Sequence, residues 1–459
     1  MDRRIRISLI VVAVLVLAYP LAPWLIGLAA EHQWQAREQV LLQQYPWLEV
    51  LERDYHRGVY SSTEELTYRL RGPVVQSLAF LGDGAHFSAT VRNTIHHGPL
   101  PQMRDFAPAT VDTRVILSPE WQARLTGWLG DKASLTIHTR LGWFGGSTTE
   151  IHSPPAEKNA TDGTTLIWRG LDGTNTVGRD MTQYVADFTS PGFSLKSVAA
   201  SLDVANLRLQ ADRRSVFDQV YVGPFNLTLD RLEMSQVMPA RQASIHNLAL
   251  DAHASAQGEY VDMDAKVTAD TLQVAEFTAS RLRYEIRTAH LHGPTLSALA
   301  RGLETAQAQS ADSIAYAQKT QDLFKTHGIE ILVRDPVIEI PTIQLVMPEG
   351  ELLVSMKVSA QGLTREELNG PPALMRLALV KHMQASADVR IDTALLDKML
   401  DSTGKGDRLA APLQGMQQQG YLKLDGKALT THLTYRNGQL EVNGLPFPAV
   451  GPMSQRPHP

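Results

Sequence analysis

Apolar and polar residues alternate with a period of two through most of the chain. The first clear runs are Leu66–Leu70, Phe87–Val91, Val111–Val115 and Leu135–Leu141, in which polar residues separate the apolar ones. Because successive side chains of a strand point to opposite faces, each run predicts a strand with one dry and one wet face. Strands of this kind are typical of antiparallel sheets.

A second series of alternating runs extends from Val198 to Ile286. Its members are Val198–Val204, Phe225–Leu229, Leu248–Ala254, Val261–Val267 and Leu282–Ile286. The parity changes at Ala205 and Asn206, which predicts a bulge or a break, since one extra residue reverses every later side chain. Alternation over so many segments predicts long amphipathic sheets, strongly curved or doubled over, rather than a parallel α/β core.

Helical spacing interrupts this pattern at a few places. Helices are predicted near 294–325, near 392–400 with Asp392 at the start, and near 412–419, with a short one at Pro119–Leu129. Gly142–Gly163 is rich in Gly, Ser, Thr and Pro and predicts a turn and an exposed loop. Further strands are predicted at 329–333, 338–340, 352–358, 422–424, 429–435 and 440–442. Asn437-Gly438 predicts a hairpin turn between the last two.

The N-terminus carries a different signal. Ile7 to Ala30 is a run of 24 residues without a charge, preceded by Arg3, Arg4 and Arg6. As a helix it would span roughly 36 Å, enough for a hydrocarbon layer of about 30 Å. The basic flank predicts a cytoplasmic N-terminus, a single-pass anchor and a remainder outside the cytoplasm. A cleaved signal peptide is the alternative.

These patterns together predict an α+β protein, predominantly antiparallel β. The predicted parts are a transmembrane anchor at 1–30 and a helical connector at 31–51. They are followed by β-rich periplasmic parts at 52–190 and 191–445 and a flexible tail at 446–459.

Composition narrows the function classes. The 459 residues include 43% hydrophobic and 20% charged residues, a balance typical of folded chains, and carry a net charge of -5. We expect no nucleic-acid partner, because that affinity depends on clustered Lys and Arg. The chain has no cysteine, which excludes disulfides and thiolate metal sites.

Several short segments carry a family resemblance. After the basic N-terminus and the apolar run come Tyr55–Ser62, with the sequence YHRGVYSS, then His97-Gly98-Pro99, and near the end Tyr435–Gly444, with the sequence YRNGQLEVNG. Together these segments resemble the YdgA family of proteobacterial proteins of unknown function, over nearly the whole chain. The resemblance implies a periplasmic location for the bulk of the chain and transfers no catalytic residues.

Two echoing motifs are the strongest candidates for a site. His96-His97-Gly98-Pro99 and His290-Leu291-His292-Gly293-Pro294 each follow a predicted strand. Four imidazoles could ligate a metal, but the favoured interpretation is that Gly-Pro ends each strand and the histidines flank the turn. The echo could also mark two related halves.

No catalytic signature is apparent. The nucleophile-elbow, zinc-protease and nucleotide-binding patterns are absent. The pairs Asp262/Asp264 and Asp401/Asp407 are weak acid/base candidates, because solvated charge is the default for such positions. We therefore assign no catalytic, cofactor-binding or metal-binding residue and expect no cofactor.

Two function classes remain. The first is a non-enzymatic structural or interaction module of the cell envelope, held by residues 7–30 and acting with a protein partner or as a homodimer. The alternative is a carrier of an apolar ligand, such as a lipid, on the dry face of a curved sheet. A continuous apolar sheet face must be covered by helix, sheet or ligand, so an open apolar groove would favour the second class.

Overall fold

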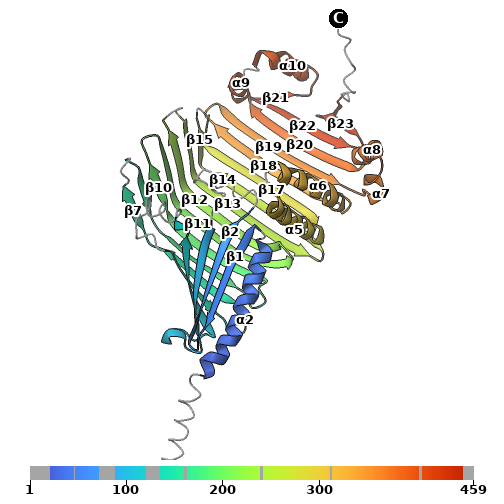
Figure 1. Cartoon of the computed structure of the whole chain (residues 1–459). Helices are drawn as coiled ribbons and strands as arrows, with labels where there is room; N and C mark the ends of the chain where they lie inside the picture. Colours follow the sequence, from blue (N-terminus) through green and yellow to red (C-terminus); the bar gives the residue numbers. More distant parts are fainter. Residues whose placement is uncertain are drawn as a thin grey trace, which may run out of the picture. The chain divides into compact units, whose positions relative to one another are not determined.

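The computed structural model describes residues 21–45, 47–71, 88–119, 135–159, 163–237, 241–275, 277–310, 313–402 and 406–447. These residues form mostly antiparallel sheet with several helices (Figure 1), which confirms the predicted class. The chain divides into two compact units, which are described separately. The N-terminal unit runs to Tyr221 and includes Leu299–Leu323, and the C-terminal unit comprises Val222–Ala298 and the chain from Phe324 onward.

The N-terminal unit combines the long helix α2 (Leu21–Gln44) with an antiparallel sheet. Its strands are β1 (Leu48–Arg57), β2 (Ser61–Leu70), β3 (Ser88–His97), β4 (Ala109–Leu117), β5 (Thr136–Leu141), β6 (Ser147–Ser153), β7 (Ala156–Asn159), β8 (Thr165–Trp168), β9 (Leu171–Val177), β10 (Gln183–Lys196) and β11 (Ala200–Phe217). A 3-10 turn, η3 (Pro101–Met103), follows β3. Strands pair in chain order from β1 to β6, and then β6 pairs with β9, β9 with β10 and β10 with β11. The hairpin β7–β8 joins the remaining length of β10.

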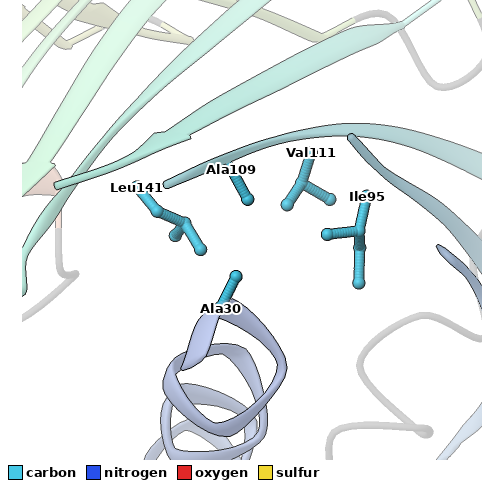
Figure 2. Close-up of a cluster of buried hydrophobic side chains, with 5 residues drawn as sticks. All are labelled: Ala30, Ile95, Ala109, Val111 and Leu141. Atoms are coloured by element: carbon cyan, nitrogen blue, oxygen red, sulfur yellow. The ribbon is translucent and has the colours of Figure 1, made fainter. Parts of the chain in front are cut away.

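Helix α2 is attached to this sheet through small residues. Ala30 is 1% exposed and packs into a cluster with Ile95, Ala109, Val111 and Leu141 (Figure 2). One turn earlier, Gly27 lies so close to β3 that a Cβ there would be 2.6 Å from Nδ1 of His97. Small side chains let the helix backbone approach the sheet closely, so α2 is part of the core of this unit.

This packing corrects the predicted N-terminal boundaries. Residues 21–30, assigned to the membrane anchor, belong to α2, and the connector predicted to reach residue 51 ends at Gln44. An apolar helix face is satisfied by a sheet as well as by lipid, and the sequence pattern does not distinguish the two. Within the described residues no helix is both long enough and apolar enough to cross a membrane. The Ile7–Pro20 part of the predicted anchor lies outside the described residues.

The C-terminal unit contains most of β12 (Val220–Gln236) and the later antiparallel strands of the sheet. The other strands are β13 (Arg241–Gln257), β14 (Tyr260–Ala269), β15 (Thr271–Val274), β16 (Phe277–Ala279), β17 (Arg281–His292), β18 (Val337–Met347), β19 (Gly350–Ala360), β20 (Met383–Asp392), β21 (Lys423–Asp425), β22 (Ala428–Arg436), β23 (Gln439–Val442) and β24 (Leu445–Pro446). The main pairing order is β12, β13, β14, β17, β18, β19, β20, β22, β23 and β24. Strand β15 pairs with β13 and β16, and β21 pairs with β22.

Among the described residues, six further helices follow along the chain. They are α5 (Gly293–Gln309), α6 (Ser313–Leu332), α7 (Arg365–Leu368), α8 (Pro372–His382), α9 (Thr393–Ser402) and α10 (Gly406–Gln418). Residues Leu299–Leu323 of α5 and α6 belong to the N-terminal unit, whereas the end of α6 and helices α7, α8 and α9 pack within the C-terminal unit. Leu368 of α7 and Ala378 of α8 are buried with Ala360 of β19, and Leu332 near the end of α6 packs on them. Leu395 of α9 is fully buried among strand residues such as Met347.

The helical prediction near 294–325 is confirmed, with the segment divided into α5 and α6, but two other local predictions are wrong. The strand predicted at 329–333 is the end of α6 and the turn after it. There Ile329, Leu332 and Val333 contact one core cluster at helical spacing, which overrides the alternating pattern. The loop predicted at Gly142–Gly163 contains β6 and β7, because its threonines suit paired strands. The predicted helix Pro119–Leu129 lies almost entirely outside the described residues.

Two sequence signals concern local backbone geometry, and the structure confirms the first. Asn437 and Gly438 have φ values of 51° and 79° and connect β22 to β23, as the hairpin prediction requires. At the predicted change of parity, Asn206 has φ of 53° inside the continuous strand β11. The register of β10 and β11 nevertheless runs from Leu207 to Ala205 without a shift, so the bulge or break predicted here is wrong for this strand pair.

Candidate binding cavity

A cavity of about 590 Å³ lies within the N-terminal unit, between α2 and the sheet. Its volume falls in the range of roughly 300–1,000 Å³ typical of small-molecule sites. The lining residues are Trp34, Arg37, Glu38, Val40, Tyr45, Leu48, Leu66, Tyr68, Leu70, Ala89, Val91, Asn93, Thr113, Ile137, Thr139, Ser147, Thr149, Asn175, Val177, Met181 and Tyr184. More than half of them are apolar or aromatic.

The strand register explains how distant segments reach one cavity. Strands β1 and β10 both supply lining residues, yet seven pairing steps separate them. In a flat sheet that separation would be about 34 Å, because neighbouring strands lie about 4.8 Å apart. The sheet must therefore curve around α2, and the cavity is the space that the helix leaves unfilled on the concave face.

The lining changes character across the sheet. On β1, β2 and β3 it consists mainly of Leu48, Leu66, Leu70, Ala89 and Val91. Between β3 and β9 it includes a row of polar residues, most of which bond to one another. Thr113 donates to Asn93 over 2.7 Å, and the hydroxyls of Thr139 and Thr149 are 3.0 Å apart. Because these groups already have hydrogen-bond partners within the protein, covering them with an apolar ligand costs little free energy.

A buried ionic network borders the cavity. The carboxylate of Glu64, which is 0% exposed, accepts hydrogen bonds from Trp34 Nε1 at 2.7 Å, Asn93 Nδ2 at 3.0 Å and Arg53 Nη2 at 2.8 Å. The same Arg53 nitrogen lies 2.6 Å from Glu38. Burial raises the pKa of Glu38, although Arg53 opposes that shift. One guanidinium thus holds two buried carboxylates between α2, β1 and β2.

Among the described lining residues, three buried polar atoms make no hydrogen bond, and one of them, Oε2 of Glu38, is ion-paired with Arg53. Nη2 of Arg37 and Oγ of Ser147 are both buried and make no hydrogen bond. Burial lowers the pKa of Arg37, against the opposing influence of Tyr184. Arginine stays charged in proteins, so this nitrogen is a desolvated donor on a cation, which is a costly arrangement.

The match to known proteins is at the level of a family. A family model described as a bacterial protein of unknown function, DUF945, matches residues 1–449. The chain belongs to this family. No curated protein and no solved structure matches it. The DUF945 match covers both compact units, so the cavity and the C-terminal sheet belong to one family architecture.

In this DUF945 protein the two histidine motifs flank strand ends. His97 is the last residue of β3 and His292 the last of β17, and both are buried. His292 Nδ1 lies 2.7 Å from the Thr295 hydroxyl, and His290 stacks on Tyr260. Among the described residues no group of three or more His, Asp or Glu side chains is arranged to hold a metal.

The chain continues differently after the two histidine motifs. Gly98-Pro99 is a cis peptide that leads into η3, whereas Gly293 and Pro294 begin α5. The motifs therefore share a strand end with a buried second histidine and diverge directly after it.

A serine–histidine pair was missed by sequence reasoning. Ser62 Oγ lies 2.9 Å from His97 Nε2, and His97 Nδ1 donates to the Val59 carbonyl over 2.9 Å. This is the arrangement of a nucleophile and its base. Ser62 is only 1% exposed, however, and α2 approaches the His97 ring at Gly27. Burial also lowers the pKa of His97. We therefore interpret Ser62 and His97 as a structural pair, whose hydrogen bond joins β2 and β3 beneath α2.

The carboxylate pairs show no shared site. Asp262 and Asp264 are exposed, and Asp262 accepts a hydrogen bond from the backbone of His290. Asp401 is exposed, and the side chain of Asp407 is not among those that the structure describes.

The two lining residues with unpaired donors, Arg37 and Ser147, could not be found from the sequence. Neither residue belongs to a motif, and no signal in the sequence indicated either one.

Proposed function

We propose that this protein is a non-enzymatic binder of an apolar ligand, which it holds in the cavity between α2 and the sheet of the N-terminal unit. The observation that carries the proposal is the cavity itself. A core normally packs to a density of about 0.75, and voids larger than a water molecule are few. This space of about 590 Å³ is partly open to solvent and is lined mainly by apolar side chains, so it has the volume and the lining of a small-molecule site rather than those of a packing defect.

The cellular setting is part of the proposal. The basic N-terminus and the apolar run after it favour an envelope protein, anchored in the inner membrane with its sheets in the periplasm. Because Gly27 and Ala30 pack on the sheet, the proposed anchor lies in the earlier part of that run. The resemblance to the YdgA family is consistent with membership in DUF945. Carbonate-resistant membrane association and protection of the sheets from cytoplasmic labels would support this location.

One observation supports the other function class, a structural or interaction module of the cell envelope. Leu374, Leu377 and Val380 of α8 are 58%, 63% and 41% exposed. Exposed apolar residues at this spacing are typical of protein contacts. Sedimentation of the full chain with and without Leu377→Glu would test whether this helix supports self-association.

The cavity proposal is tested with two variants of one strand. Val91 lines the cavity and its neighbour Arg92 points to the exposed face. The full chain is purified in mild detergent, its lipids are extracted and identified, and displacement of a fluorescent fatty acid is measured. We expect about one bound apolar molecule per chain, loss of binding in Val91→Trp, and retention in Arg92→Trp. Absence of both bound lipid and probe displacement in the wild type would refute the proposal.

A further inference from the structure

The polar end of the cavity can be located from the strand register. Ser147 of β6 pairs with Val177 of β9, and Val177 pairs with Tyr184 of β10. Residues in direct register share one face of a sheet, and all three line the cavity. Gln33, one turn before Arg37 on α2, donates to the carbonyl of Gly142 between β5 and β6 over 3.4 Å, so this face of the helix lies near the row. The apolar residues Leu48, Leu66 and Leu70 lie on β1 and β2, where the charges that border the cavity are paired with one another in the Glu38–Arg53–Glu64 network.

The two groups without partners both lie toward this polar end. Ser147 is 8% exposed, and its hydroxyl has no hydrogen bond. Nη2 of Arg37 is likewise buried and unpaired. Oε2 of Glu38 also makes no hydrogen bond, but Glu38 and Glu64 are both ion-paired with Arg53 and thus have a cation of their own. A cation and a hydroxyl that both lack partners are suited to an anionic group.

From this arrangement we infer that the bound molecule is a single-chain amphiphile with an anionic head, a carboxylate or a phosphate. Its head bonds to Arg37, with Ser147 as a second donor, and its chain lies toward β1 and β2. This inference rests on the proposed function and specifies its ligand class. A guanidinium suits both anions because its planar N–H groups match their oxygens.

The head group is tested with three probes that share one chain: hexadecanoic acid, hexadecylphosphate and hexadecanol. Each displaces a fluorescent fatty acid from the full-length protein in mild detergent. Charge-assisted hydrogen bonds contribute about 1.5–3 kcal/mol, so we expect the two anions to bind about 10- to 100-fold more tightly than the alcohol. At a pH below the pKa of the bound fatty acid, its advantage should vanish, whereas the affinity of the alcohol should not change.

Substitutions identify the residue that is responsible for the tighter binding of the two anionic probes. Arg37→Met should remove the advantage of both anions and leave the alcohol unaffected, and Arg37→Lys should restore part of it. Ser147→Ala should have a smaller effect of the same kind. Arg213→Met is the matched control, because Arg213 is a half-buried arginine of the same unit that does not line the cavity.

The outcomes separate this inference from the proposed function. Equal affinity of the three probes for the wild type would overturn the anionic head and leave apolar binding intact. No binding of any probe would overturn both. A preference that persists in Arg37→Met but is lost in Arg213→Met would refute the role of Arg37. A preference for one anion alone distinguishes a fatty acid from a phosphate-bearing lipid.

Discussion

The two compact units solve the same physical problem in different ways. Each contains an antiparallel sheet with one apolar face, and such a face must be covered. In the C-terminal unit, Leu368, Ala378 and Leu395 of three short helices fill part of that role with tightly packed side chains. In the N-terminal unit, α2 contacts the sheet closely at Gly27 and Ala30 but leaves a cavity farther along.

The hollows of the two units also differ in chemistry. A pocket of about 480 Å³ in the C-terminal unit is lined by groups such as Asp388, Arg390 and His432. His432 Nδ1 bonds to Asp388 at 2.6 Å, and Arg390 bonds to Asp425 at 2.6 Å. Those charges pair with one another at the surface, whereas the N-terminal cavity is mainly apolar and retains an unpaired cation donor. The comparison indicates that the cavity proposed as a ligand site arises from incomplete covering of the sheet and does not follow from the sheet pattern itself.

The largest expected effect is in the ionic network of the N-terminal unit. Arg53→Met leaves the buried carboxylates of Glu38 and Glu64 without a cation. Breaking a buried ion pair in this way costs about 3–5 kcal/mol. The loss should be smaller at acid pH, where a carboxylate can take up a proton. Denaturant unfolding at two pH values measures both effects.

The matched control is Arg69→Met. Arg69 also pairs with a glutamate across β1 and β2, but the side chain of that glutamate, Glu49, is 28% exposed, whereas those of Glu38 and Glu64 are 8% and 0% exposed. An exposed pair contributes about 0–1 kcal/mol. Similar losses in the two variants would contradict the view that the carboxylates near the cavity depend on Arg53.

The second prediction concerns the filled core of the C-terminal unit. Leu395 is 0% exposed in a cluster with Ala279 and Met347. Leu395→Ala should lower the free energy of unfolding by about 2–5 kcal/mol, because it leaves a cavity. Fatty-acid binding should persist in conditions where the variant is folded. Leu374→Ala, at an exposed position, is the control, and a loss of ligand binding in Leu395→Ala would contradict the separation of roles.

Sequence patterns predicted the strands well and the covering of the sheets poorly. Alternation identifies a dry face, and Asn437-Gly438 fixes a turn, because both depend on local geometry. The cavity depends on side chains from eight strands and one helix meeting in space, which no local pattern encodes. Arg37 appeared as an ordinary charged residue of a connector helix. The apolar stretch at 21–30 predicted lipid contact, since the sequence does not distinguish lipid from a concave sheet.

The third prediction tests the close contact of α2. A side chain at Gly27 would meet the ring of His97, so Gly27→Val should force α2 away from β3. Overpacking of this kind costs about 1–3 kcal/mol. The displacement should also alter the cavity and weaken fatty-acid binding. Ala29→Val is the control, because Ala29 is exposed on the same helix, and equal behaviour of the two variants would refute the contact.

The smallest expected effect is a pH dependence at the outer face of the N-terminal unit. Asp112 is partly buried, which opposes its ionisation, but hydrogen bonds and charge from His138 and His96 outweigh burial and lower its pKa. His138 also lies 3.9 Å from Asp105, and Gln102 bonds to His96. A carboxyl whose pKa is depressed by folding stabilises the fold above its unfolded pKa of about 3.9, and that contribution is lost as the pH falls through the folded value. Asp112→Asn should therefore lower the midpoint of unfolding slightly at neutral pH and converge with the wild type in acid. Because Asp112 is 45% exposed, solvent screening keeps the difference small.

Fatty-acid affinity should not change, since Asp112 does not line the cavity. A variant difference that grows as the pH falls would reverse the sign and refute this account of the histidine pair.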